Sequence, residues 1–173
     1  MSAESLRAKI REVPDFPKPG ILFYDITTLL KDAAAYRESI QLMLEPHKSE
    51  GIDLVVGMES RGFIFSAPMA YELGVGLVPV RKLGKLPAET VSVEYALEYG
   101  SNTLEIHRDA IEPGQKVLIV DDLLATGGTV QGTIELVERL KGEVVGLAFL
   151  VELDFLKGRE RLQGRRVTSV VRY

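Results

Sequence analysis

Two adjacent carboxylates stand beside a segment whose composition suits an anion-binding loop. Residues 117–130 read VLIVDDLLATGGTV, an apolar run followed by Asp121 and Asp122 and then by small and hydroxyl-bearing residues. Gly127 and Gly128 allow a tight turn that points backbone N–H groups at an anion. The helix predicted after them would present its positive N-terminal end to the same anion. Two acids would repel an anion, so we expect them to bind another part of the ligand.

A ligand that carries both a phosphate and a sugar accounts for the two acids. A carboxylate accepts hydrogen bonds from vicinal ribose hydroxyls, and it also holds waters of a magnesium ion that neutralises other phosphates. We therefore expect the loop amides to bind a 5-phosphate while Asp121 and Asp122 hold the ribose and, indirectly, Mg²⁺. The alternative is a plain glycine turn with Thr129 as the helix N-cap, which gives no reason for the acids. The segment matches neither G-x-x-x-x-G-K nor G-x-G-x-x-G.

Composition excludes several other classes of protein. The 173 residues suit one domain, 1–173, and contain no cysteine, which excludes disulfides and thiol catalysis and fits a cytoplasmic protein. His47 and His107 form no ligand pattern, so neither a histidine metal site nor a Ser-His-Asp triad is expected. The net charge of −4 and the absence of a long apolar run argue against nucleic-acid and membrane partners.

Strands and helices alternate along the chain, which predicts an α/β fold with a central, mostly parallel sheet and flanking helices. We expect strands at 54–58, 77–80, 117–120, 144–151 and 167–171, and helices at 5–13, 33–48, 63–73, 129–141 and 157–162. Alternating residues at 91–99, a Gly-Ser-Asn turn and renewed alternation predict an antiparallel hairpin. Loops that follow parallel strands lie at one sheet edge, so 59–62 and 121–129 should meet there.

Residues 117–130 closely resemble the phosphoribosyl-pyrophosphate binding motif of the type I phosphoribosyltransferases. Five segments narrow the resemblance to the adenine-specific members, in their order and spacing: DFPKPGILF, ESRGF, VRKLGKLP, LEYGSNTLEIHRDAI and VDDLLATGGT. The resemblance runs from about Ile10 to Val151. It implies a type I phosphoribosyltransferase-like fold with a hairpin flap and, in residues 1–30, an N-terminal helix and a hood over the base. It further implies a purine salvage enzyme, a cytoplasmic homodimer that uses Mg²⁺ to convert adenine and 5-phosphoribosyl 1-pyrophosphate into AMP and pyrophosphate.

The resemblance also implies a role for individual residues. The phosphoribose would be bound by Asp121, Asp122, Ala125, Thr126, Gly127, Gly128 and Thr129. Pyrophosphate would be bound by Ser60, Arg61, Gly62, Arg81, Lys82 and Lys85, some of these basic residues reaching a neighbouring subunit. Adenine would be bound by Leu22, Phe23 and Tyr24, although many family members have Arg at position 24. Glu98 would be the catalytic acid or base, and Tyr99 would belong to the flap.

Simpler interpretations remain for these residues. Leu22 and Phe23 would otherwise be core residues, the basic cluster a solvated face, and Glu98 an exposed strand carboxylate. Two other functions also remain: a phosphoribosyltransferase for another purine, hypoxanthine-guanine or xanthine, and a phosphoribosyl-pyrophosphate-sensing regulator. The acidic composition and the lack of an appended DNA-binding segment argue against the regulator.

Overall fold

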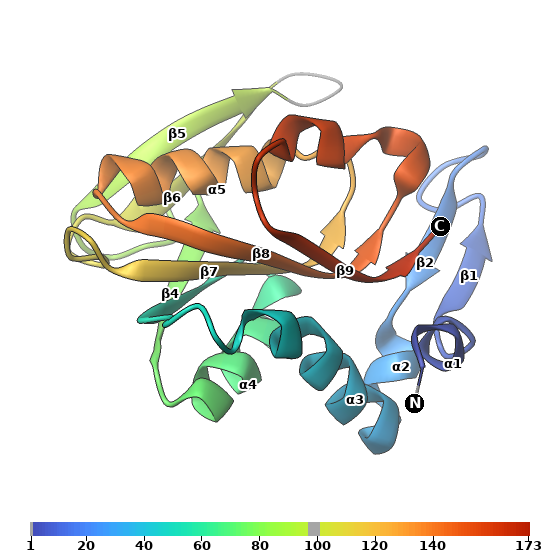
Figure 1. Ribbon diagram of the computed structural model, residues 1–173. Helices are drawn as coiled ribbons and strands as arrows, with labels where there is room; N and C mark the ends of the chain where they lie inside the picture. Colours follow the sequence, from blue (N-terminus) through green and yellow to red (C-terminus); the bar gives the residue numbers. More distant parts are fainter. Residues whose placement is uncertain (1, 97–100) are drawn as a thin grey trace.

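A seven-stranded sheet lies at the centre of the computed structural model, which describes residues 2–96 and 101–173 (Figure 1). The strand order is β5-β6-β4-β3-β7-β8-β9. Pairing is parallel from β4 to β9 and antiparallel where β6 joins β4 and β5, which confirms the mostly parallel sheet. The strands are β3 (Leu54–Met58), β4 (Gly76–Lys82), β5 (Thr90–Ala96), β6 (Ser101–His107), β7 (Lys116–Leu124), β8 (Glu143–Glu152) and β9 (Val167–Arg172).

Helices cover both faces of the sheet (Figure 1). Helices α3 (Ala33–Leu44) and α4 (Gly62–Leu73) lie on one face, and α5 (Gly128–Arg139) lies on the other. Strand β7 shows why both faces are covered: Leu118 and Val120 belong to the apolar cluster with α3 and α4, whereas Val117 and Ile119 belong to the cluster with α5. Such continuous apolar runs are typical of parallel strands that are buried on both sides.

The N-terminal segment forms a separate two-stranded antiparallel sheet beside the main one (Figure 1). It contains α1 (Ala3–Arg7), β1 (Arg11–Pro14), β2 (Leu22–Asp25) and α2 (Thr27–Leu30). The predicted helix at 5–13 was therefore too long. Pairing of β1 with β2, together with hydrogen bonds from the Arg11 guanidinium to Asp25, overrides the helical spacing of the apolar residues.

The other differences from prediction have local causes. Strand β7 continues past 120 to Leu124 because Asp121, Leu123 and Leu124 still pair with β8. Helix α3 ends at Leu44 and continues as the 3₁₀ turn η1 (Glu45–His47), since Pro46 has no N–H to extend the α-helical ladder. Past β8 the chain forms two 3₁₀ helices, η2 (Asp154–Leu156), which was not predicted, and η3 (Gly158–Leu162), which falls at the short helix predicted at 157–162.

β2 and α2 were not predicted, whereas the other elements fall close to their predicted bounds. Pro68 lies inside α4, which runs unbroken from Gly62 to Leu73. The hairpin is confirmed over its described residues, with Thr90 opposite His107 and Glu94 opposite Thr103. Glu98 and Tyr99 lie outside the described residues, so their predicted roles stay predictions. Within residues 2–96 and 101–173, no helix is both long and apolar enough to cross a membrane.

Candidate active site

The loop between β7 and α5 has the form expected of a phosphate site. Gly127 is the N-cap of α5 with a φ of +83°, a left-handed conformation that favours glycine. No side chain caps this helix, so Thr129 is not the N-cap, contrary to the alternative interpretation. The first amides of α5 therefore remain available to a ligand. Residues of the segment 121–130 enclose a cavity of about 50 Å³ here, lined by Asp121, Leu123, Leu124, Ala125, Thr126, Gly127, Gly128, Thr129 and Val130.

Asp121 and Asp122 occupy successive positions of an extended strand, so each lines one cavity that the other does not. Asp121 lines the phosphate-loop cavity, and Asp122 lines a pocket beside the N-terminal sheet. Asp122 is buried and pairs with Arg61, whose Nε lies 2.8 Å from Asp122 Oδ2. Asp121 Oδ1 accepts a hydrogen bond from the Asp122 N–H at 2.8 Å.

The electrostatics of the two acids favour a cationic ligand. Burial and, next, the charge of Asp122 raise the pKa of Asp121 well above its ordinary value. Burial also raises the pKa of Asp122, against the opposing charge of Arg61. The described residues contain no cluster of three or more metal-ligating side chains, so they provide no all-protein metal cage. Mg²⁺ fits nevertheless, because it binds one or two carboxylates and completes its shell with water and substrate phosphates.

The loop after β3 lies directly against these acids, as predicted. A β-carbon at Gly62 would lie 2.8 Å from Asp121 Oδ1 and 3.0 Å from the Val120 carbonyl oxygen, so only glycine allows this approach. The two loops border a cleft of about 510 Å³. Its lining residues are Glu59, Ser60, Arg61, Lys82, Tyr95, Asn102, Leu104, Asp121, Asp122, Leu123, Ala125 and Thr129.

Among the predicted basic residues, Lys82 lines the cleft, whereas Arg81 and Lys85 are absent from its described lining. The Arg81 guanidinium instead donates to Glu59, with both N···O distances at 3.3 Å, and to the Lys85 carbonyl at 3.4 Å. The Lys82 N–H also donates to Glu59, and this hydrogen bond is the main reason why the pKa of Glu59 is lowered. Glu59 thus fixes the start of the basic segment.

A second pocket, of about 110 Å³, lies between β2 and the carboxyl ends of β7 and β8. Its lining is mostly apolar: Ile21, Leu22, Phe23, Tyr24, Ile26, Arg61, Asp122, Leu123, Val151 and Leu153. The Phe23 ring lies 5.7 Å from the Arg61 guanidinium and packs edge-to-face on Phe16, with centroids 5.1 Å apart. Leu22 pairs with Pro14, which has no N–H to donate to it.

The Tyr24 ring packs against the C-terminal strand segment rather than against Phe23. Its ring stacks on Tyr173, with centroids 3.8 Å apart and an interplanar angle of 28°, and burial is the main cause of the raised pKa of Tyr24. Tyr24 therefore lines the pocket while its ring is engaged by the C-terminal residue.

Several lining residues were not predicted from the sequence. Three of them lie at or just beyond the ends of β7 and β8: Leu123, Val151 and Leu153. Their position at the end of an apolar run was the sequence signal that could have placed them at the ligand-binding edge of the sheet. Tyr95 and Asn102 are paired across the β5–β6 hairpin, and both line the cleft, so the hairpin forms part of its wall.

Comparisons with known proteins agree with this geometry. The model of the phosphoribosyl transferase domain matches residues 25–170. An adenine phosphoribosyltransferase of Acidobacterium capsulatum is 60% identical over 173 residues, covering 100% of this chain and 96% of that protein. The crystal structure of the Thermoanaerobacter pseudethanolicus enzyme of the same name superimposes with a TM-score of 0.96 at 54% identity, covering 99% of this chain and 100% of that one.

A yeast relative is similar over the same extent. The crystal structure of Saccharomyces cerevisiae adenine phosphoribosyltransferase, complexed with an imino-altritol bisphosphate and adenine, has a TM-score of 0.92 at 41% identity, covering 98% of each chain. Sequence and fold match across essentially the whole length, through both loops and the N-terminal sheet, and this chain therefore belongs to the adenine phosphoribosyltransferase family.

Proposed function

We propose that this chain transfers the 5-phosphoribosyl group of 5-phosphoribosyl 1-pyrophosphate to adenine, yielding AMP and pyrophosphate in purine salvage. The observation that carries the proposal is the junction at Asp121 and Asp122. An uncapped helix N-terminus, a polar cleft and an apolar pocket meet there, and Arg61 and Asp122 line both of the latter two. Phosphate, pyrophosphate and a flat base need these three environments side by side.

Each part of the substrate has a matching group of residues. The 5-phosphate would accept hydrogen bonds from the amides of residues 125–129, and the ribose hydroxyls would donate to the two aspartates. Pyrophosphate would lie between the loop Ser60–Gly62 and Lys82. The base would stack on Phe23 with its edge against the Leu22 backbone, since the yeast relative binds adenine together with a bisphosphate.

In the reaction, a ring nitrogen of adenine forms a bond to the anomeric carbon while the bond from that carbon to the pyrophosphate oxygen breaks. The nitrogen loses its proton, and Glu98 is the group that we propose takes or shares it. Gly127, Gly128 and Asp121 would hold the sugar in place, while Arg61 balances negative charge beside the leaving group. Mg²⁺, when bound through Asp121 and Asp122, would neutralise the pyrophosphate.

The proposal extends to assembly and location. Neither Arg81 nor Lys85 is in the described lining of the cleft, and we propose that these basic residues serve a neighbouring subunit in a homodimer. The Arg81 guanidinium, which donates to Glu59 and to the Lys85 carbonyl, would have to exchange these contacts on assembly. The composition without cysteine suits a cytoplasmic enzyme.

Product formation tests the function. The chain is incubated with 5-phosphoribosyl 1-pyrophosphate, Mg²⁺ and adenine, hypoxanthine or guanine, and nucleotides and pyrophosphate are quantified by anion-exchange chromatography. We expect AMP and pyrophosphate in equal amounts with adenine, and no AMP when Mg²⁺ is chelated. Pyrophosphate release without nucleotide formation would contradict the transfer reaction.

A further inference from the structure

The segment after β8 supports the phosphate loop from behind. Gly158, the buried first residue of η3, lies so close to the loop that a β-carbon there would stand 2.2 Å from the Ala125 carbonyl oxygen and 3.0 Å from the Gly127 nitrogen. A β-carbon at Gly127 would in turn stand 2.8 Å from the Gly158 carbonyl oxygen. The two backbones therefore touch with no side chain between them, and any shift of Gly158 is transmitted to the loop amides.

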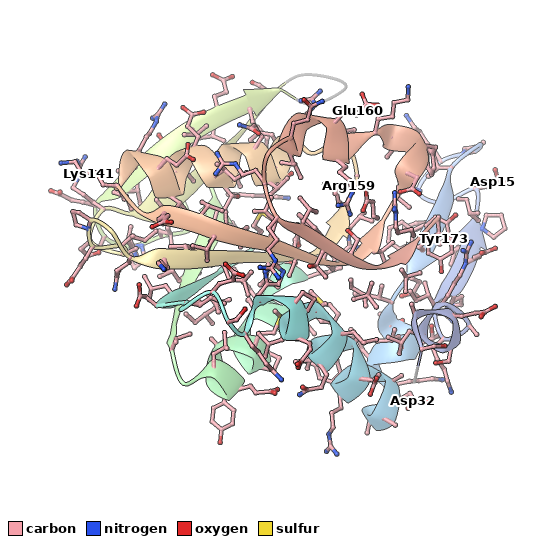
Figure 2. All side chains as sticks on the ribbon, in the orientation of Figure 1. Asp15, Asp32, Lys141, Arg159, Glu160 and Tyr173 are labelled. Atoms are coloured by element: carbon pink, nitrogen blue, oxygen red, sulfur yellow. The ribbon has the colours of Figure 1, made fainter. Side chains whose placement is uncertain are left out.

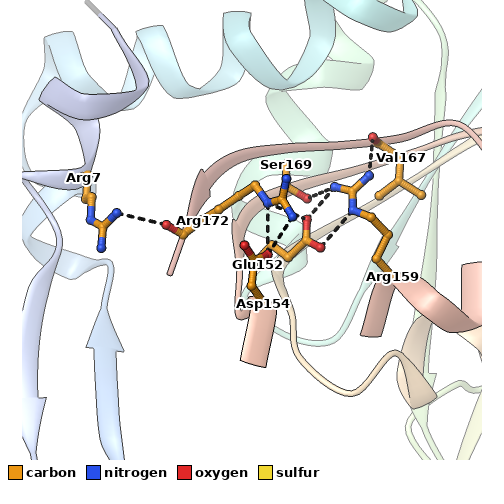
Figure 3. Close-up of polar contacts among 7 residues, drawn as sticks. All are labelled: Arg7, Glu152, Asp154, Arg159, Val167, Ser169 and Arg172. Atoms are coloured by element: carbon orange, nitrogen blue, oxygen red, sulfur yellow. Dashed lines mark hydrogen bonds and ion pairs between the residues drawn. The ribbon is translucent and has the colours of Figure 1, made fainter. Parts of the chain in front are cut away.

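The next residue, Arg159, ties this contact to the sheet (Figure 3). Its guanidinium makes a two-pronged contact with Glu152, with Nε 2.9 Å from Oε1 and Nη2 2.5 Å from Oε2. Nη1 donates to the Val167 carbonyl at 3.1 Å, and Nη2 also donates to the Ser169 hydroxyl at 3.2 Å. One side chain thus joins η3 to β8 and β9 in a planar geometry that lysine cannot reproduce.

The charge of Glu152 is maintained although the side chain is only 3% exposed. Burial alone would raise the pKa of Glu152, but hydrogen bonds from Arg159 and Ser169 bring it below its ordinary value. Arg159 lies between η3 and the sheet, whereas its neighbour Glu160 points away from the fold (Figure 2). At the far end of η3, Leu162 is 2% exposed and lies in the apolar core under α5. The segment is therefore anchored at two residues that follow its contact with the loop, Arg159 and Leu162.

We propose that Arg159 is a positioning residue for 5-phosphate binding: by bonding Glu152, Val167 and Ser169 it holds Gly158 against Ala125 and Gly127, and so fixes the amides that bind the phosphate. The inference rests on the proposed function of that loop. It also assigns Arg159 to the phosphate side of the site, because the three atoms nearest to a β-carbon at Gly158 all belong to Ala125 and Gly127 of the β7–α5 loop.

Two substitutions test the two halves of the contact. Arg159→Ala removes the anchor, and Gly158→Ala keeps the anchor but inserts a methyl group where the Ala125 oxygen lies. The matched control is Arg165→Ala, which breaks an ion pair with Glu138 Oε1 at 2.7 Å in the same C-terminal segment without releasing Gly158. Isothermal titration calorimetry measures the affinity for ribose 5-phosphate and, separately, for pyrophosphate with Mg²⁺, for each full-length chain.

We expect both variants to weaken ribose 5-phosphate binding by about tenfold or more, because small displacements of binding groups cost up to about 100-fold. Pyrophosphate affinity should stay within about twofold, and the control should match the wild type for both ligands. Arg159→Lys should restore only part of the loss, since a single ammonium replaces a planar fork.

Unchanged ribose 5-phosphate affinity in folded Arg159→Ala would overturn the inference, as would an equal loss for both ligands, which would indicate a role in overall stability only. If Arg159→Ala does not fold, Gly158→Ala decides: a selective loss supports the inference and no loss overturns it. A wild-type chain that binds pyrophosphate but no ribose 5-phosphate would refute the proposed function, and this inference with it.

Discussion

His47 gives the fold a pH dependence whose size follows from its surroundings. The residue is fully buried at the end of η1, and neither ring nitrogen has a hydrogen-bond partner among the described residues. Gly146 of β8 lies against the ring so closely that a β-carbon there would be 2.3 Å from Nδ1. Burial, followed by the positive charge of Arg166, lowers the pKa of His47 from 6.5 to about 4. The folded chain therefore holds this imidazole neutral.

Linkage converts the lowered pKa into a loss of stability in acid. Above pH 6.5 both states are neutral, and between pH 6.5 and about 4 only the unfolded chain binds the proton, so stability falls as the pH falls. At about 1.36 kcal/mol per pKa unit, the full effect is about 3 kcal/mol, of which about 2.5 kcal/mol should be lost by pH 4.5.

Urea denaturation of the wild type and His47→Leu, at pH 7.5 and pH 4.5, measures this loss. Leucine removes the titrating group and the two unpaired nitrogens while keeping an apolar side chain of similar size. Titration of all other groups is common to both chains, so the difference between their free energies of unfolding isolates His47. We expect His47→Leu to gain about 2.5 kcal/mol relative to the wild type between the two pH values. Parallel pH dependences would refute the reasoning and show that the imidazole is solvated or paired.

Three further predictions concern the site. Gly127→Val should abolish binding of AMP and of 5-phosphoribosyl 1-pyrophosphate in a folded chain, because the left-handed φ is strongly unfavourable for valine and its side chain would collide with the Gly158 carbonyl. Unchanged AMP affinity by calorimetry would contradict the assignment of the loop. Replacing Asp121 and Asp122 with Asn should lower activity and raise the Mg²⁺ concentration needed for half-maximal rate, whereas an unchanged Mg²⁺ titration would return both acids to a structural role. Glu98→Gln should lower kcat by about 10²–10⁴ while the KM for the phosphoribosyl donor changes little, and the control Glu94→Gln in β5 should leave kcat unchanged; a normal kcat in Glu98→Gln would return Glu98 to the simpler interpretation.

The sequence was sufficient to predict the sheet and the meeting of its two loops. Apolar runs followed by glycine-containing turns fix the parallel strands, and topology then brings Arg61 and Asp122 to one edge. The extension of β7 through Asp121 could not be predicted, because a carboxylate has low strand propensity and only pairing with β8 keeps it extended. Strand β1 was missed because it too depends on pairing with another segment: its partner β2 lies across a turn that contains two prolines.

Contacts between distant segments were beyond the reach of sequence patterns. Gly62 was predicted as a pyrophosphate residue, but its closest constraint is the side chain of Asp121. Arg81 was predicted as a pyrophosphate ligand, and its guanidinium is bound to Glu59. Gly158 resembles any turn glycine in the sequence, and only the folded chain reveals its contact with the loop.

The central claim is that the pocket beside β2 selects adenine for transfer, and the ratio of kcat/KM for adenine to that for guanine measures it most directly. A backbone amide that matches the adenine edge leaves buried donors and acceptors unpaired with guanine, at about 1–3 kcal/mol for each unpaired group. Initial rates are measured at saturating phosphoribosyl donor and Mg²⁺, with hypoxanthine as a third base. We expect a ratio of about 100 or more, which corresponds to two such groups. Equal values of kcat/KM for adenine and guanine would contradict the claim.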